Sequence, residues 1–337
     1  MVYCAGSKEA GARNGETRMS LLLIIFLLSF FFLGYSSSFL VRILTTIARF
    51  LRLSEYAVAF ILMSVVTSAP ELFIGIAAAV RGVPILSLGD VLGANIINIT
   101  LVIGLAALFG GGLSVESKIS RKNFFIIFGL ALFPIFLAVD GMISRGDGLV
   151  LLLLLAFYLW SVAREREHFT KAINHFSKHK AHHGSALRSF MLFGLGAAVL
   201  LVSSGLLVWS GSALAKMFSI STFTFGVLFI SLGSALPEIG FSIRAAILKH
   251  PSMTVGNALG SIAFTAAGVV GIVSIIHPIE VERISMLFSP GLFLLLALLS
   301  FNLFLAHKMN ISRREGWVLV SLYLVFILSE YVIGLGI

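Results

Sequence analysis

Stretches of about 20 apolar residues, separated by short polar segments, recur along the whole chain. A helix needs about 20 such residues to cross the hydrocarbon layer of a bilayer. The pattern predicts an all-α polytopic membrane protein with ten transmembrane helices. The expected spans are 20–50, 55–81, 86–109, 121–139, 147–163, 189–215, 222–248, 253–277, 285–306 and 315–335.

The composition agrees with this pattern. Hydrophobic residues make up 58% of the chain and charged residues 12%, and the mean hydropathy is +1.05. A surface this poor in charge needs lipid around it, so soluble enzymes, nucleic-acid-binding modules and disordered scaffolds are excluded. The single cysteine, Cys4, excludes a disulfide framework and a cysteine-based metal site.

The basic residues predict the orientation in a cell membrane. With ten spans, the side that holds both termini carries seven of the 24 lysines and arginines, and the opposite side carries the other 17. Because the basic side faces the cytoplasm, both termini are expected to be extracytoplasmic. Residues 1–18 lack an apolar run and a cleavage site, so we expect a disordered N-terminal tail and not a signal peptide.

The longest polar segment, 164–188, is expected to join a first half (19–163) to a second half (189–337). It is too short for a folded regulatory domain, and we interpret it as a solvated cytoplasmic linker. A regulatory metal site is the alternative, since imidazole binds transition metals. The segment contains five histidines among its lysines: His168, His175, His179, His182 and His183.

An internal repeat relates the two halves. Residues 64–104 align without a gap to 231–271, at an offset of 167 residues and with eleven identical positions, which include both residues of a Pro-Glu pair. Five predicted helices, an odd number, separate the copies, so equivalent segments cross the membrane in opposite directions. Two inverted five-helix repeats are typical of secondary transporters, which bind their substrate near the midplane where the repeats meet.

The Pro-Glu pairs place carboxylates inside apolar spans. Glu71 and Glu238 lie more than a dozen residues from the ends of their predicted helices, and Asp90 is a third acid near the start of the next span. A charge at the bilayer centre costs about 2.5–3.5 kcal/mol on insertion scales. With no lysine nearby in the sequence, an exchangeable cation is the expected partner. The alternative is a pair of protonated, structural acids. The remaining acids, including Glu330, lie at predicted helix ends or loops and are expected to be interfacial.

Other hard oxygen atoms surround these acids. Proline has no N–H to donate to the carbonyl four residues earlier in a helix. Pro70 therefore leaves the carbonyl of Val66 without its helical donor, and Pro237 does the same for the carbonyl of Gly233. Carboxylates, carbonyls and hydroxyls suit Ca²⁺, which takes six to eight oxygen ligands at about 2.3–2.6 Å, and the absence of cysteine and histidine disfavours soft metals. The hydroxyls belong to Thr67, Ser68 and Ser234.

Each copy also contains two glycines four residues apart, a spacing that lets membrane helices approach closely. The polar residue beside the first glycine is Asp90 in one copy and Asn257 in the other. Asn95 and Asn98 continue the polar line in the first copy, whereas the second has Ile262 and Thr265, so the site is not fully symmetric. The glycines are Gly89, Gly93, Gly256 and Gly260.

At these residues the sequence resembles the cation/Ca²⁺ exchanger superfamily, and most closely its prokaryotic Na⁺/Ca²⁺ exchanger branch. The first signature motif reads Thr67-Ser68-Ala69-Pro70-Glu71 with Gly89-Asp90-x-x-Gly93-x-Asn95. The second reads Gly233-Ser234-Ala235-Leu236-Pro237-Glu238 with Gly256-Asn257-x-x-Gly260-Ser261.

The resemblance implies roles for these residues. Glu71 and Glu238 are implied to be central Ca²⁺ ligands that also bind Na⁺, and Asp90 and Asn257 to complete the central ring. The flanking Na⁺ sites would use oxygens of Thr67, Ser68 and Ser234, with Ala235 standing where a serine is usual. The implied function is Na⁺/Ca²⁺ antiport by alternating access, without enzymatic activity or cofactor, by a chain that works as a monomer in the bilayer.

Three alternatives remain. A Ca²⁺/H⁺ exchanger of the same fold is the nearest, and Ala235 mildly favours it. A passive cation channel would more usually be an oligomer around a shared pore, with no need for inverted halves. An intramembrane enzyme is disfavoured because no His-Glu-x-x-His or Ser/Lys arrangement is present.

Overall fold

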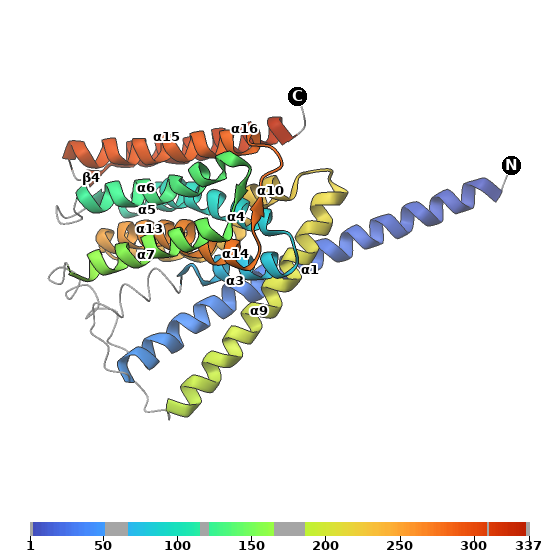
Figure 1. Cartoon of the computed structure of the whole chain (residues 1–337), viewed down its shortest axis with the longest axis horizontal. Coiled ribbons are helices and arrows are strands. Elements are labelled where there is room, and N and C mark those ends of the chain that lie inside the picture. The colour runs from blue at the N-terminus through green and yellow to red at the C-terminus, as the bar shows by residue number, and fades with distance from the viewer. Residues whose placement is uncertain (1–2, 51–66, 115–120, 165–185, 309, 335–337) are drawn as a thin grey trace.

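Helices form nearly all of the computed structural model, which describes residues 3–50, 67–114, 121–164, 186–308 and 310–334 (Figure 1). The α-helices are α1 (Tyr3–Phe50), α3 (Ala69–Val80), α4 (Pro84–Ile97), α5 (Ile103–Gly110), α6 (Arg121–Leu137), α7 (Arg145–Arg164), α9 (Ala186–Met217), α10 (Thr222–Phe225), α11 (Ser231–Ser234), α12 (Leu236–Ile247), α13 (Pro251–Ala263), α14 (Val270–Ile276), α15 (Ser285–Lys308) and α16 (Arg313–Gly334). Wider π-helical turns, η2 (Asn98–Val102), η4 (Gly226–Ile230) and η5 (Phe264–Val269), connect several of them, and a 3₁₀ turn, η3 (Ala138–Asp140), follows α6.

Two short antiparallel ladders join the loops. Strand β1 (Leu113–Ser114) pairs with β4 (Asn310–Ile311), and β2 (Met142–Ile143) pairs with β3 (Ile279–Glu280). Each ladder therefore connects a loop of the N-terminal half of the chain to a loop of the C-terminal half.

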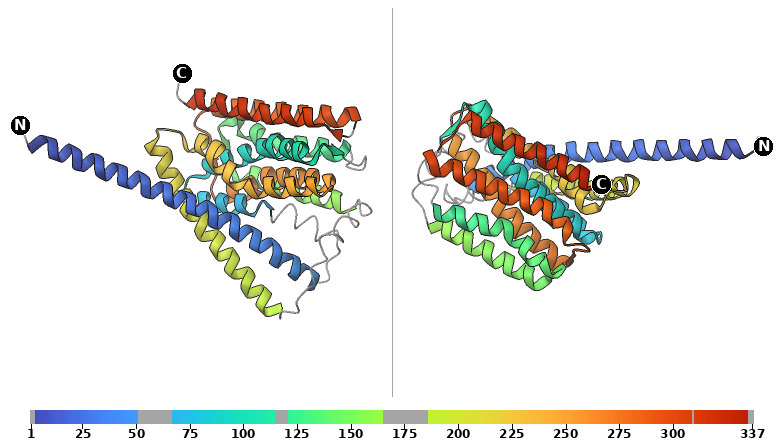
Figure 2. Two further views of the ribbon diagram at one scale, coloured as in Figure 1. Left: turned by 180° about the vertical axis from the view of Figure 1, so that it is seen from behind. Right: turned by 90° about the horizontal axis from the view of Figure 1, so that it is seen from above.

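The first helix differs from the sequence-based expectation. A disordered tail is expected over residues 1–18, but α1 begins at Tyr3 and continues without a break to Phe50. The physical reason is that extending an existing helix costs far less than nucleating one, and this segment contains alanine, lysine, glutamate and arginine, which are good helix formers. Its N-terminal part projects away from the remaining helices (Figures 1 and 2).

The helices form two groups. Helices α1 and α9 lie side by side and diverge from a bundle that contains α4 to α7 and α13 to α16 (Figures 1 and 2). Buried side chains of α1 and α9 share a small apolar cluster with α3, which includes Phe26, Leu33, Ile74, Leu207 and Val208. The bundle has its own, larger core.

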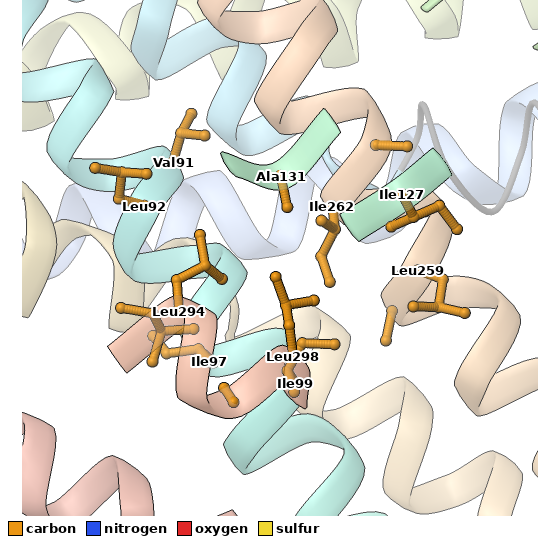
Figure 3. Close-up of a cluster of buried hydrophobic side chains, with 14 of the residues drawn as sticks. Val91, Leu92, Ile97, Ile99, Ile127, Ala131, Leu259, Ile262, Leu294 and Leu298 are labelled. Carbon is orange, nitrogen blue, oxygen red and sulfur yellow. The ribbon is translucent and has the colours of Figure 1, made fainter. Parts of the chain in front are cut away.

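Aliphatic side chains from four helices of the bundle and the turn η2 meet in one part of its core (Figure 3). Such close packing fixes the relative positions of α4 and α13, the helices that carry Asp90 and Asn257. The contributing side chains are Val91, Leu92 and Ile97 of α4, Ile99 of η2, Ile127 and Ala131 of α6, Leu259 and Ile262 of α13, and Leu294 and Leu298 of α15.

The fold is that of an all-α polytopic membrane protein. Within the described residues, six helices are long and apolar enough to cross a bilayer, or seven if the bent pair Thr222–Ser234 and Leu236–Ile247 counts as one span. Helix α3 and the segment Phe124–Asp140 are apolar but shorter. Two expected segments lie partly outside the described residues. These are residues 55–66 of the expected span 55–81 and residues 165–185 of the expected linker 164–188.

The internal repeat reappears in the element boundaries. An offset of 167 residues separates Ala69 from Leu236 and Val80 from Ile247, so α3 and α12 begin and end at equivalent positions. The same offset relates the first residues of α4 and α13, and those of α5 and α14. It also relates the β1–β4 ladder to the β2–β3 ladder, because β1 corresponds to β3 and β2 to β4 within one residue.

Candidate functional site

Helix breaks lie at the centre of each repeat. Ala235 separates α11 from α12, and the two segments bend by 43° at that point. The equivalent residue of the first copy, Ser68, immediately precedes α3. Pro70 and Pro237 lie in the first turn of the helix after each break, where the missing N–H of proline is tolerated. Within the described residues, α3 and α12 therefore begin at the same position of the repeat.

Glu71 and Glu238 occupy the first turns after these breaks. Each is 1% exposed, and each is the acidic residue in the first turn of its helix, α3 or α12. The N-terminus of a helix carries a partial positive charge that stabilises a nearby carboxylate. Breaking the two helices thus places positive helix ends next to the buried acids.

Asp90 joins the two halves of the site. It is fully buried on α4, and the hydroxyl of Ser234 on α11 donates a 3.0 Å hydrogen bond to its Oδ1. Glu71 lies close enough to Glu238 and Asp90 for their charges to interact, and Ser234 is also within hydrogen-bonding range of Glu71. The three acids that the sequence singles out are therefore neighbours.

Many oxygens of this group have no hydrogen-bond partner among the described residues: Glu71 Oε2, Asp90 Oδ2, and Oε1 and Oε2 of Glu238. Within that part of the chain, no lysine, arginine or histidine pairs with the acids. The three carboxylates do not converge on one metal-sized point in this conformation. A bound cation would therefore need oxygens of neighbouring residues as well.

A line of polar side chains runs beside the acids between α4 and α13. Ser68 and Ser261 share a hydrogen bond of 2.9 Å, and Asn98 Nδ2 donates to the same Ser261 hydroxyl at 3.1 Å. Thr265 Oγ1 donates to Asn95 Oδ1 at 2.7 Å. Ser68 thus contacts the second half of the chain.

Ser261 is the residue that the choice of candidate ligands missed. It meets residues of the first half from α13, and Asn257, Ser261 and Thr265 follow one another at four-residue intervals on one helix face. That spacing was the signal available in the sequence, since residues four apart share a face of a helix.

The other predicted residues have different surroundings. Asn257 is fully buried on α13, and neither amide atom has a partner in the described structure. Gly233 lies in α11, and the amide of Ala235 donates to the carbonyl of Ser231 at 3.0 Å. Thr67 is partly exposed and Val66 lies outside the described residues.

The glycines of the first copy allow close helix contact, as predicted. A Cβ at Gly89 would collide with the carbonyl of Phe223, and one at Gly93 would collide with Ser231. On the opposite segment, a Cβ at Gly226 would collide with the carbonyl of Leu86. Helix α4 therefore packs directly against the backbone of α10 and η4, beside Asp90.

One acid outside the site departs from expectation. Glu330 is expected at an interface but is only 3% exposed, between α15 and α16, and its Oε1 has no partner in the described structure. The sequence signal is misleading because Glu330 lies near the end of its helix but on the face that packs against α15.

Comparisons with known proteins agree with this arrangement. The sequence profile described as "Sodium/calcium exchanger protein" matches residues 21–163 and 188–332. The sodium/calcium exchanger MaX1 of Methanosarcina acetivorans is 25% identical over 92% of this chain and 98% of its own. The inner membrane protein YrbG of Escherichia coli is 26% identical over 88% of this chain and 93% of its own.

Solved structures give the same result. A structure of the sodium-calcium exchanger NCX_Mj, soaked with Na⁺ and Sr²⁺, superimposes with a TM-score of 0.63 and 27% identity, and the match covers 92% of this chain and 99% of that one. MaX1 and NCX_Mj are both named as exchangers. The chain therefore belongs to the sodium/calcium exchanger protein family, in the prokaryotic Na⁺/Ca²⁺ exchanger branch of the cation/Ca²⁺ exchanger superfamily.

Proposed function

We propose that this protein is a secondary antiporter that exchanges Na⁺ for Ca²⁺ by alternating access, with both ions using the carboxylates of Glu71 and Glu238. The observation that carries the proposal is the group of buried, neighbouring acids from both repeats. Four of their carboxylate oxygens lack hydrogen-bond partners among the described residues. The printed names of MaX1 and NCX_Mj, a sodium/calcium and a sodium-calcium exchanger, support it.

The ligand set is made of hard oxygens. Glu71 and Glu238 are the central Ca²⁺ ligands, and Asp90 and Asn257 complete the group from α4 and α13. Oxygen ligands of this kind suit Ca²⁺ and Na⁺ better than soft metals. Flanking Na⁺ positions would use Thr67, Ser68 and Ser234, and the carbonyls of Val66 and Gly233.

Competition follows from charge. Ca²⁺ and Na⁺ need the same carboxylates, so each ion displaces the other. An empty site leaves several like charges together in a poorly solvated interior, and that state resists closing over a dry barrier. A cation-loaded site is free of this cost and can pass between the two access states. Movement of the empty carrier is thereby suppressed, which couples Na⁺ entry to Ca²⁺ extrusion.

We further propose ten spans arranged as two inverted five-helix halves in the cell membrane, with both termini extracytoplasmic. The repeat offset of 167 residues, which recurs in the bounds of three helix pairs and in the two ladders, supports two equivalent halves. Halves related in this way can exchange roles, so that outward-open and inward-open states are close in energy.

A Ca²⁺/H⁺ exchanger of the same fold is the second candidate. One observation favours it: Ala235, at the break before α12, is fully buried and offers no hydroxyl where the equivalent Ser68 does. A flanking Na⁺ position would lose one ligand there, and protons could neutralise the carboxylates instead. A relative, the putative antiporter CaxA of Alkalimonas amylolytica, is 28% identical over 83% of this chain.

Reconstituted vesicles test the proposal. Proteoliposomes loaded with Na⁺ and diluted into Na⁺-free buffer at equal pH should take up ⁴⁵Ca²⁺, whereas a pH gradient alone should drive little uptake. Glu71→Gln and Glu238→Gln should each abolish uptake. Glu330→Gln, which removes a buried carboxyl outside the site, should retain it. Uptake driven only by the pH gradient would favour the proton exchanger, and normal uptake by both site variants would reject the site.

A further inference from the structure

The repeat gives the molecule two equivalent mouths. At one end, which we call the outer mouth, the turn between α3 and α4 faces the end of α14 at His277. At the other end, the inner mouth, the turn between α12 and α13 faces the end of α5 at Gly110. The names follow the proposed orientation. Gly82 and Lys249 hold the same repeat position in the two turns, as do His277 and Gly110 at the facing helix ends.

The two turns share an unusual backbone conformation. Gly82 has φ +72° and Lys249 has φ +62°. A positive φ is easy for glycine but unfavourable for a lysine. A lysine held in this conformation points to a contact that compensates for the backbone cost.

That contact bridges the inner mouth, where Gly110 also packs against Ala246 of α12. Lys249 Nζ donates a 2.9 Å hydrogen bond to the carbonyl of Gly110, the last residue of α5. The C-terminus of a helix carries a partial negative charge, so an ammonium group binds well there. Because α5 belongs to the first half and Lys249 to the second, the bond connects the two halves across the mouth.

The outer mouth is open at the equivalent place. Gly82 has no side chain, and a pocket of about 370 Å³ lies between it and His277. Nothing lies within 4 Å of the position where a Cβ of Gly82 would stand. Glu280 and Glu282 also line this pocket, whereas Arg313 lies beside Lys249 near Gly111 at the inner mouth. The mouths thus differ in closure and in charge.

Each helix that leads from a mouth to the acids carries one buried hydroxyl. Ser87 lies on α4, between the turn at Gly82 and Asp90, and Ser242 lies on α12, between Glu238 and Lys249. Both are buried, and neither hydroxyl has a partner among the described residues. Ser242 therefore stands on α12 between Glu238 and the Lys249–Gly110 contact.

We propose that Lys249 is a positioning residue that holds the inner mouth closed, and that it sets how readily cations reach the site from that side. This inference rests on the proposed exchange function, but it concerns access and not ion coordination. Loss of the bond frees the α12–α13 turn to move away from α5 and exposes the route to Glu238. The outer mouth lacks such a contact because glycine replaces lysine.

A single-cysteine reporter tests the proposal without transport. Cys4→Ser removes the only cysteine of the chain, and Ser242→Cys then places a near-isosteric thiol on α12 between Glu238 and the Lys249–Gly110 contact. In inverted vesicles, Lys249→Met should raise the labelling rate of this thiol by a hydrophilic maleimide about 3- to 10-fold. The size is that expected for losing one partly exposed, charge-assisted hydrogen bond. Methionine keeps the length and the same backbone requirement, so the change isolates the donor.

Two matched variants complete the experiment. Lys249→Arg retains a cationic donor. In this variant the thiol of the Ser242→Cys reporter should be labelled as fast as in the reporter that keeps Lys249. Gly82→Lys, at a position with free space around it, places a lysine in the outer turn; it should slow the labelling of a Ser87→Cys reporter in right-side-out vesicles. An unfolded variant is recognised by its elution in size-exclusion chromatography and is replaced by Lys249→Gln.

The outcomes are separable. Faster labelling with Lys249→Met but not with Lys249→Arg supports the proposal, as does a fall in the cytoplasmic Ca²⁺ concentration that half-saturates transport. Equal labelling rates for the parent reporter and for its Lys249→Met and Lys249→Arg variants would overturn the proposal. This holds even if Glu71→Gln and Glu238→Gln abolish transport and so support the exchange function. Conversely, suppose that Lys249→Met changes the labelling rate but the protein does not exchange Na⁺ for Ca²⁺. That result would support the role of Lys249 and contradict the proposed exchange function.

Discussion

Ser234 has a central place at the residue scale because its hydroxyl reaches an acid of the other half. It lies in the last turn before the helix break and donates to Asp90 Oδ1. A hydrogen bond to a charged group in a buried site is stronger than one between neutral groups. The side chain thus fixes Asp90 relative to Glu238, which lies four residues further along the chain.

Ser234→Ala should weaken Ca²⁺ binding about 10-fold, because one charge-assisted hydrogen bond is lost in a buried site. Titration of Ca²⁺ into the purified protein measures this change. Ser210→Ala is the matched control, since the Ser210 hydroxyl bonds only to carbonyls of its own helix. Equal affinities for the Ser234→Ala protein and the wild type would contradict a role for this hydroxyl.

The residues of the site could be predicted unevenly. Glu71 and Glu238 stand out in the sequence because an acid inside an apolar span is costly and needs a reason. Ser261 belongs to the second motif but is not chosen as a ligand. A serine is cheap to bury, and its significance depends on Ser68, which lies 193 positions away in the chain. Glu330 shows the opposite error, since distance from a helix end does not report which face is buried.

Glycine contacts dominate at the scale of elements. Helix α4 packs against the backbone of α10 and η4 because Gly89 and Gly93 leave no side chain between them. Small residues at such contacts allow membrane helices to approach closely. The contact holds Asp90 at the level of the break before α12.

Gly89→Ala should lower the thermal stability of the purified protein, since the new methyl group meets the carbonyl of Phe223. Overpacking of this kind costs about 1–3 kcal/mol. Gly129→Ala is the control: nothing lies within 4 Å of its Cβ position on α6, so stability should be unchanged or slightly higher. Thermal unfolding followed by tryptophan fluorescence compares the two. Equal losses for both variants would contradict the role of the contact with Phe223, since Gly129 has no such contact.

Helix positions follow well from hydropathy, whereas their interruptions do not. The apolar runs predict most helical segments within a few residues, because burial in lipid dictates them. The π-helical turns at Asn98–Val102 and Phe264–Val269 left no such trace, since they depend on packing between helices. The helical start at Tyr3 was missed because polarity alone does not separate a solvated helix from a tail.

Asymmetry between two equivalent ends is the main feature of the whole molecule. The repeat predicts equal mouths, but Lys249 bridges one and Gly82 leaves the other open. The sequence contains both residues, yet their significance appears only when Gly110 and His277 are placed opposite them. The repeat offset could be predicted from sequence; the contacts between the halves could not, because they join residues more than a hundred positions apart.

Orientation gives a prediction at this scale. Cys4 is the only cysteine, and the distribution of the basic residues predicts that the termini lie outside the cell. A membrane-impermeant maleimide should therefore label Cys4 in intact cells. In a Cys4→Ser background, Ser177→Cys in the expected cytoplasmic linker should be labelled only after the membrane is permeabilised. The reverse pattern would contradict the proposed topology, and with it the assignment of the inner and outer mouths.

The central claim is that Ca²⁺ and Na⁺ compete for one site built on Glu71 and Glu238. Equilibrium binding of ⁴⁵Ca²⁺ to the purified protein tests it most directly, with Na⁺ as competitor and choline at equal ionic strength as control. Na⁺ should displace the bound Ca²⁺ and choline should not. Glu71→Gln and Glu238→Gln should each weaken binding more than about 100-fold, because even partners outside the ligand sphere are worth 10- to 100-fold. Unchanged Ca²⁺ binding by either variant, or binding that Na⁺ does not reduce, would contradict the account.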